Sequence, residues 1–142
     1  MSPIEGVAIR QLDGRDDGAL GRLMERAYAG TIDEDLGDSS DGAVEIAGWR
    51  ESGAVGTASF VAVSNGRVPV AASLVSVRAG AEHWIAYVIT DPAWKRRGLG
   101  RAVVTASLGV LADVAVFAGI TDGNAASERL FTGLGFVRVG PA

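Results

Sequence analysis

The pattern of apolar and polar positions changes along the chain, and it divides the sequence into helices and strands. Between residues 16 and 29 apolar side chains recur at helical spacing, whereas residues 114–120 form a continuous apolar run rich in Val and Ala. A run of that kind is typical of a strand covered on both faces. The pattern predicts strands at 7–10, 59–63, 68–77, 82–90, 114–120 and 136–139, and helices at 16–29, 43–49, 99–112 and 124–134.

Turn and capping residues support these boundaries. Asn65-Gly66 is a strong hairpin signal, because both residues tolerate a positive φ. Asn124 is a natural N-cap for the last helix, and Gly135 is a natural residue to end it. Strands that first follow one another and later alternate with helices predict an α/β fold with a mixed sheet whose N-terminal strands are antiparallel. A length of 142 residues predicts a single domain over 1–142.

Composition and charge exclude several classes of function. The chain has 13 basic and 17 acidic residues and a net charge of −4, which argues against nucleic acid as a partner. It has no Cys and a single His, so a thiol nucleophile, a disulfide framework and a zinc finger are excluded, and we expect no metal.

Residues 102–120 carry only one charge, and their length is close to that of a membrane-spanning helix. The charge, Asp113, lies near the middle of the stretch, where it would cost about 2.5–3.5 kcal/mol in a bilayer. We therefore interpret the stretch as a helix followed by a strand, and expect no membrane contact. The N-terminus lacks a basic region followed by an apolar run, so we expect a cytoplasmic protein.

The segment most informative about function lies between a strand and a helix, at residues 91–101. It combines two glycines with four of the 13 basic residues of the chain. Glycines allow another molecule to approach the backbone closely, and the first amide groups of a helix favour an anion. A polyanion, most plausibly a pyrophosphate, is the predicted partner of these residues: Lys95, Arg96, Arg97, Gly98, Leu99, Gly100 and Arg101.

Three kinds of phosphate site compete for this segment. A P-loop requires Lys followed by Ser or Thr, but Arg96 follows Lys95, the only lysine of the chain. A dinucleotide fingerprint requires a third small residue three positions after Gly100, where the chain has Val103. A site for the pyrophosphate of an acyl-CoA requires backbone donors flanked by cations, and the segment meets this requirement.

With these residues the chain resembles the GNAT superfamily of N-acetyltransferases. The family's Gln/Arg-x-x-Gly-x-Gly/Ala motif corresponds to residues 95–100, with Lys95 at the first position. A second family signature, Asn-x-x-Ala-x-x-Leu-Tyr-x-x-x-Gly-Phe, is similar to residues 124–136. The two motifs stand one helix and one strand apart, as they do in the family, and the resemblance covers nearly the whole chain. It implies a single GNAT-like domain with a splayed central strand pair and about four helices.

The resemblance also implies a cosubstrate and a mechanism. Acetyl-CoA would lie between the fourth and fifth strands and donate its acetyl group to an amine that attacks it directly in a ternary complex. The pantetheine arm would bond the backbone of Val88, Ile89 and Thr90, and Asn124 would contact the cofactor. The amine acceptor would be a small molecule or a peptide.

Phe131 departs from the family signature. Family members usually carry Tyr at this position, placed to protonate the leaving thiolate, and Phe cannot donate a proton. General acid catalysis is typically worth about 10²–10⁴-fold, although water can protonate an alkyl thiolate of pKa about 8.5. A non-catalytic acyl-CoA-binding or regulatory domain is therefore the competing hypothesis, and a homodimer whose C-terminal segment completes a neighbour's sheet is a further alternative.

Other polar residues are candidates for handling the amine. Glu82 and His83 begin the fourth strand, from which a base often acts in this family, but a solvated polar pair at the end of a strand is the favoured interpretation. The acidic region 33–51 is interpreted mainly as a solvated surface. Asp33 and Glu34 are its candidates for binding substrate, because they directly follow the first helix.

Overall fold

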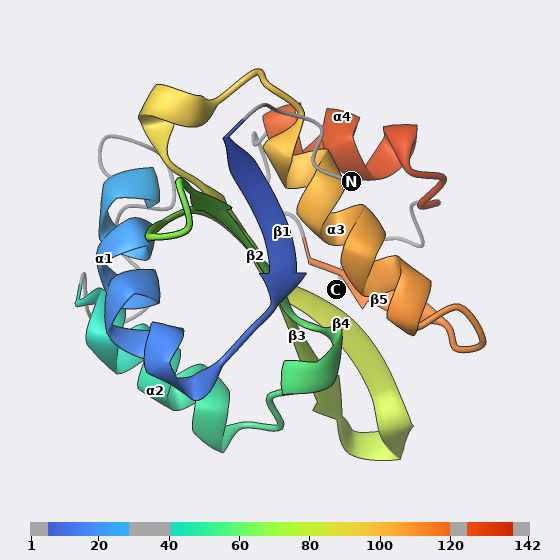
Figure 1. The fold of residues 1–142 in the computed structure, drawn as a ribbon. Helices are drawn as coiled ribbons and strands as arrows, with labels where there is room; N and C mark the ends of the chain where they lie inside the picture. Colours follow the sequence, from blue (N-terminus) through green and yellow to red (C-terminus); the bar gives the residue numbers. More distant parts are fainter. Residues whose placement is uncertain (1–5, 29–40, 120–124, 138–142) are drawn as a thin grey trace.

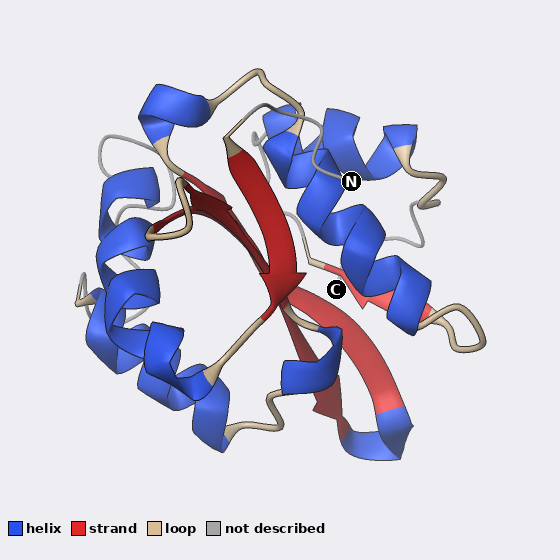
Figure 2. Ribbon diagram, in the orientation of Figure 1, coloured by secondary structure: helices blue, strands red, loops and turns tan. Residues whose placement is uncertain are grey.

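The computed structural model describes residues 6–28, 41–119 and 125–137 of the chain. They form a five-stranded sheet in the order β1-β2-β3-β4-β5, in which only the β4–β5 pair is parallel. The mixed α/β domain predicted from the sequence is confirmed (Figures 1 and 2). The strands are β1 (Val7–Gln11), β2 (Phe60–Ser64), β3 (Val68–Arg78), β4 (Glu82–Thr90) and β5 (Val116–Ala118); the helices are α1 (Asp17–Tyr28), α2 (Gly42–Glu51), α3 (Leu99–Val110) and α4 (Ala125–Gly133). Single 3₁₀ turns are η1 (Gly14–Asp16), η2 (Gly56–Ala58), η3 (Ala79–Ala81) and η4 (Pro92–Trp94).

Helices cover both faces of the sheet, with α1 and α2 on one side and α3 and α4 on the other (Figure 1). On the first side Leu20, Leu23 and Met24 of α1 are fully buried against β2, β3 and β4. On the second side Val103 and Val104 of α3 are fully buried. Full burial of a Val, Leu or Met side chain is worth about 1.5–3 kcal/mol, so both helix layers stabilise the sheet substantially.

Two glycines allow α1 and α2 to touch. A Cβ added to Gly21 would lie 2.9 Å from the backbone nitrogen of Ala43, and one added to Gly42 would overlap the carbonyl oxygen of Gly21. Glu25 of α1 accepts a hydrogen bond from the Gly42 amide at 2.7 Å, so it caps the start of α2. The pairing of these helices therefore depends on backbone contact.

The predicted hairpin and helix end are confirmed. Asn65 and Gly66 have φ values of +52° and +70°, and Arg67 donates its amide hydrogen to the Ser64 carbonyl at 3.0 Å. Gly135 ends α4 with a φ of +92°. The Phe136 amide then donates to the Phe131 carbonyl at 3.0 Å, a bond that closes the C-terminal turn.

The strand predicted at 114–120 is shorter than expected. Only Val116–Ala118 pair with β4, and all three are half-buried instead of covered on both faces. Val114 belongs to the turn after α3, where its amide donates to the Leu111 carbonyl at 3.2 Å. A strand at 136–139 is not observed for Phe136 and Val137, because the turn at Gly135 folds Phe136 back onto α4. Residues 138 and 139 lie outside the described part.

The two central strands, β4 and β5, separate after a short contact. β5 pairs with only three residues of β4, which run from His83 to Ile85. Beyond Ile85, β4 pairs with a strand only on its β3 side within the described part of the chain. The predicted splayed pair is therefore present, and it leaves backbone hydrogen-bonding groups of β4 open along one edge.

Candidate functional site

The open half of β4 leads directly to the start of α3. Ile89 is buried in the core beneath α1 and α2, so the neighbouring side chains of Val88 and Thr90 point to the opposite face. There a Cβ added to Gly100 of α3 would lie 3.6 Å from Thr90 Oγ1 and 3.8 Å from Val88 Cγ1. The end of one strand and the start of one helix thus form two sides of the same site.

Asp91 fixes the chain where it leaves β4. Its amide donates to the Val70 carbonyl at 2.8 Å, and its side chain accepts from the Ala93 amide at 2.9 Å. Its second carboxylate oxygen accepts from Arg26 Nε at 3.0 Å. Its role was not expected from the sequence, although Asp before Pro92 at the end of a strand is a common turn signal.

The loop between η4 and α3 turns sharply through two residues with positive φ. Gly98, the N-cap of α3, has a φ of +81°, and Arg96 has a φ of +65°. Gly100, the other glycine of the motif, is helical. Of the two glycines in the motif, only Gly98 therefore uses the backbone freedom of glycine. Alternating left-handed residues of this kind form concave backbone sites that favour anions.

The first amide groups of α3 are available to a ligand. No side chain caps the helix, and the first hydrogen bond inside it runs from the Ala102 amide to the Gly98 carbonyl at 3.0 Å. Within the described ranges no acceptor takes the amide hydrogens of Leu99, Gly100 or Arg101. These three donors and the positive end of the helix dipole favour a bound anion.

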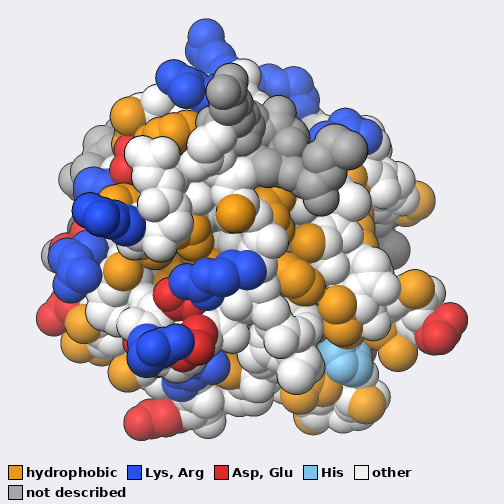
Figure 3. All heavy atoms as spheres, in the orientation of Figure 1, with side chains coloured by type: hydrophobic (Ala, Val, Ile, Leu, Met, Phe, Trp, Pro, Cys, Tyr) orange, Lys and Arg blue, Asp and Glu red, His pale blue; other side chains and the backbone are white. Residues whose placement is uncertain are grey.

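Four exposed cations surround these amide groups. Lys95, Arg96, Arg97 and Arg101 form no ion pair with any described acidic residue. Arg97 lies 4.9 Å over the ring of Trp94, which itself packs against the core beside α3. In Figure 3, Lys and Arg side chains gather at the top of the view, over the loop between η4 and α3 in Figure 1. The site therefore combines directed amide donors with positive charge that no described carboxylate neutralises, as a pyrophosphate requires.

Residues 21–136 of this sequence match the acetyltransferase (GNAT) family. The chain belongs to this family. No curated protein is matched to the chain by sequence.

Solved structures show the same fold. The chain is similar to the ribosomal-protein-S18-alanine N-acetyltransferase of Escherichia coli, with 24% identity, a TM-score of 0.74, and coverage of 94% of this chain and 79% of that chain. A putative acetyltransferase of Salmonella typhimurium, solved with its cofactor acetyl-CoA, is 24% identical, with a TM-score of 0.70 over 94% of this chain and 80% of that one. The aminoglycoside N-acetyltransferase AAC(6')-Iy, solved with CoA, is 15% identical, with a TM-score of 0.69 and coverage of 96% and 91%.

The open edge of β4 in this GNAT protein begins at a β-bulge. Leu74 of β3 pairs with Tyr87 and Val75 pairs with Ile85, so Ala86 is an extra residue on β4. The bulge places Ala86 and Tyr87 together on the α1–α2 face, whereas Ile85 packs on the face of α3 and α4. The bulge therefore lies at the point where β5 and β4 part.

A hydrogen-bonded pair at this bulge was not anticipated from the sequence. The Tyr87 hydroxyl donates to Glu45 Oε2 of α2 at 2.9 Å. Burial, and to a lesser extent the hydrogen bond and the charge of Glu45, raise the pKa of Tyr87 to about 12. No local sequence signal could have revealed the pair, because 42 residues separate its members.

Glu82 and His83, the predicted candidates for a base, lie at the start of β4. Seven residues separate His83 from Thr90, or about 23 Å at the usual rise of a strand. Glu82 Oε1 accepts from Trp84 Nε1 at 3.4 Å, and His83 Nδ1 is buried with no hydrogen-bond partner among the described residues. Both residues thus occupy the closed end of the β4–β5 pair, away from the basic loop.

The remaining predicted residues belong to α4 or lie outside the described ranges. Phe131 is 5% exposed and contacts Phe136 edge to face, with their ring centroids 5.0 Å apart. Asn124, Asp33 and Glu34 lie outside the described residues, so their roles stay predictions. Within the described ranges there is no group of three or more His, Asp or Glu side chains able to hold a metal ion, and no helix long and apolar enough to cross a membrane.

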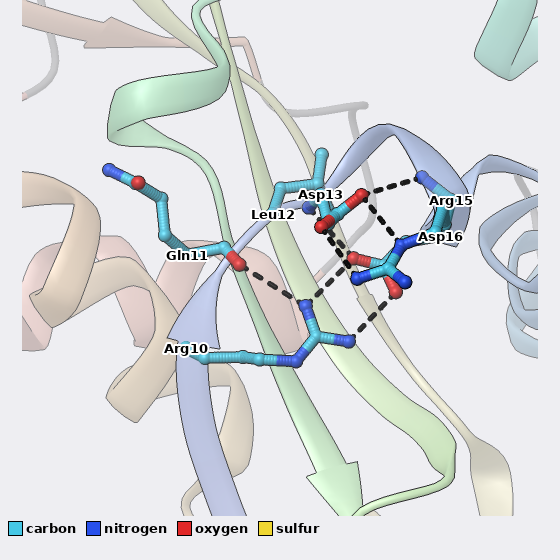
Figure 4. Close-up of a pocket in the computed structure, with 6 residues that line it drawn as sticks. All are labelled: Arg10, Gln11, Leu12, Asp13, Arg15 and Asp16. Carbon is cyan, nitrogen blue, oxygen red and sulfur yellow. Dashed lines mark hydrogen bonds and ion pairs between the residues drawn. The ribbon is translucent and has the colours of Figure 1, made fainter.

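A separate polar pocket lies where β1 turns into α1 (Figure 4). Asp16 accepts two hydrogen bonds from the Arg10 guanidinium, both at 2.8 Å, and a third from the Asp13 amide at 2.8 Å. The bonds from Arg10 hold the pKa of the Asp16 carboxyl below its usual value. Because its charged groups satisfy one another, we assign this pocket a role in stability.

Proposed function

We propose that this chain is an acetyl-CoA-dependent N-acetyltransferase that transfers the acetyl group to a primary amine by direct attack in a ternary complex. The observation that carries the proposal is the basic loop between η4 and α3, which leads into a helix whose Gly100 lies against Val88 and Thr90 at the open end of β4. The loop combines free amide donors with four cations that pair with no described acidic residue. Membership of the acetyltransferase family supports it. A related fold solved with its cofactor acetyl-CoA gives further support.

Each part of the cofactor has proposed contacts. The loop amides from Arg96 to Arg101 bind the pyrophosphate, with the side chain of Lys95 beside them. The open backbone groups of β4 from Val88 to Thr90 bond the pantetheine arm and help to polarise the thioester carbonyl. Asn124 contacts the cofactor from the start of α4, and Phe131 occupies the position of the usual acid. Most of the rate gain then comes from positioning the two substrates.

The acceptor is an amine on a protein or on a small molecule. Relatives of this fold include an enzyme named for the alanine of a ribosomal protein and another named for aminoglycosides. Asp33 and Glu34 stay candidates for holding such an amine. An acetyl-CoA-dependent reaction also fits the predicted cytoplasmic location. The formation of a homodimer stays a prediction.

A non-catalytic acyl-CoA-binding domain is the second candidate function. Phe131 favours it, because a phenyl ring lacks the proton that the family's Tyr supplies to the departing thiolate. Water can supply that proton instead, so the catalytic proposal does not require Tyr at this position.

Titration calorimetry with acetyl-CoA, followed by a thiol-release assay over a panel of amines, tests both candidates. The chain contains no Cys, so a thiol reagent reports only the CoA that is released. Binding together with amine-dependent release is the expected result. Binding without release on any amine, and without slow hydrolysis, would establish the binding module. If acetyl-CoA produced no heat, both functions would be rejected.

A further inference from the structure

We propose that Glu45 of α2, positioned by Tyr87 of β4, binds the acceptor amine and receives a proton from it. This inference rests on the proposed acetyltransferase function and assigns that reaction a catalytic residue on the α1–α2 side of the sheet. Two observations carry it: the hydrogen bond between the two side chains, and the place of Tyr87 at the bulge where β4 and β5 separate.

The bulge locates the pair relative to the expected cofactor. Three residues separate Tyr87 from Thr90, which is about 10 Å at the usual rise of a strand. A pantetheine arm that starts at the basic loop and extends along the open edge of β4 carries its thioester toward Ala86 and Tyr87. Because the bulge turns Tyr87 toward α2, the Glu45 carboxylate lies beside this stretch of β4.

Glu45 has an oxygen available for a substrate. Tyr87 donates to Oε2, and within the described part of the chain Oε1 has no hydrogen-bond partner and the carboxylate has no ion pair. Arg50 of α2 and Arg26 of α1 are engaged elsewhere, since they pair with Asp17 and Asp91. Glu45 is half-buried, and a carboxylate with one oxygen held and the other open can bind a primary ammonium group.

Tyr87 serves as the positioning residue. Its pKa of about 12 keeps the hydroxyl protonated and donating throughout the physiological range. A hydroxyl fixed on a strand restricts the rotamers of the Glu45 side chain, and this restriction aims Oε1. The side chain of Glu51, at the other end of α2, is exposed and has no such partner among the described residues.

The proposed step conserves atoms and charge. The bound ammonium gives one proton to Glu45, which passes it to solvent. The neutral nitrogen attacks the thioester carbonyl carbon, a C–N bond forms and the C–S bond breaks. The second proton that the nitrogen loses goes to the CoA thiolate, so the products are an amide, free CoA thiol and one proton.

Three variants test the assignment: Glu45→Gln, Tyr87→Phe and the control Glu51→Gln. Glu45→Gln keeps the shape of the side chain and removes its charge, so we expect kcat/KM for the amine to fall by about 10²-fold or more. Tyr87→Phe should raise the KM for the amine by about fivefold with a smaller change in kcat. All three should bind acetyl-CoA as the wild type does in calorimetry, and Glu51→Gln should keep wild-type kinetics.

A second measurement does not depend on turnover. The chain has two tyrosines, so ¹³Cζ-tyrosine labelling gives two NMR signals, and the Tyr87→Phe variant assigns them. With CoA bound, we expect the Tyr87 signal to move when an alanine-initiated peptide, an aminoglycoside or spermidine is added. In Glu45→Gln, the same addition should leave the signal in place.

The outcomes separate the inference from the proposed function. If acetyl-CoA does not bind, both fail together. If the wild type acetylates an amine and Glu45→Gln matches its kcat and KM, the inference alone is wrong. If the wild type binds CoA without turnover, the NMR titration decides: a Tyr87 signal unmoved by every amine rejects the amine site, and a shift lost in Glu45→Gln upholds it.

Discussion

Arg26 of α1 donates a hydrogen bond from Nε to Oδ2 of Asp91 at 3.0 Å and thereby ties the first helix to the end of β4. The Asp91 side chain is only 17% exposed, and its other oxygen caps the turn that begins the basic loop. The helix on one face of the sheet thus restrains the proposed cofactor site at the end of the strand.

Replacing Asp91 with Ala should weaken acetyl-CoA binding. The variant loses the bond to the Ala93 amide and the pair with Arg26, and a lost cap costs about 1 kcal/mol. If acetyl-CoA has to order the loop against this cost, its dissociation constant should rise about fivefold. Calorimetry checks the value, with Arg15→Ala as a control that removes a highly exposed ion pair away from the loop. Equal affinities in the two variants would contradict the prediction.

A β-branched residue at Gly98 should abolish acetyl-CoA binding while the domain stays folded. Gly98 has a φ of +81°, a conformation that Val adopts only at a cost of about 1–2 kcal/mol, so the start of α3 must shift. Gly80→Val provides a matched control, because Gly80 has a φ of +78° and equally open surroundings but lies in the β3–β4 turn. Circular dichroism should show both variants folded. Calorimetry should show that only Gly98→Val loses binding, and unchanged affinity would refute the loop assignment.

Phe131→Tyr should have opposite effects on stability and turnover. The Phe131 ring is buried and lies edge to face with Phe136, so an added hydroxyl without a partner should cost about 1–2 kcal/mol of the free energy of unfolding. Turnover should rise, because the new hydroxyl restores the acid that family members usually carry. Chemical denaturation and the thiol-release assay measure the two effects. Unchanged turnover would mean that protonation of the thiolate does not limit the rate.

Asp16→Asn should destabilise the protein in a manner that depends on pH. Arg10 lowers the pKa of the folded Asp16 carboxyl, so its contribution to stability is fully present above the pKa of the unfolded chain and is lost as the pH falls. We expect Asn to cost about 2 kcal/mol at pH 7, because it breaks charged hydrogen bonds to Arg10. Denaturation of both proteins should show the gap closing below about pH 4. A gap that is constant with pH would contradict this account.

The sequence by itself determined the order of elements, most of their boundaries and the basic loop. These features arise from local physics: apolar spacing selects helix or strand, and residues such as Asn65 and Gly135 specify turns and helix ends through their own backbone preferences. Local patterns could not set the length of β5, since an apolar run does not show where pairing stops. Local patterns also did not predict that Arg96 would adopt a positive φ.

Only the tertiary structure brought Tyr87 to Glu45, Asp91 to Arg26 and the backbone of Gly21 to Gly42. Each pair joins elements distant in the sequence, and its geometry depends on how helices cross and where a strand bulges. A bulge reverses the face of every side chain that follows it. Ile85 and Tyr87 therefore lie on opposite faces of the sheet, although a regular strand would place residues two apart on the same face. The candidate cofactor loop follows from a contiguous motif, whereas the candidate amine site exists only because the folded sheet and its helices meet there.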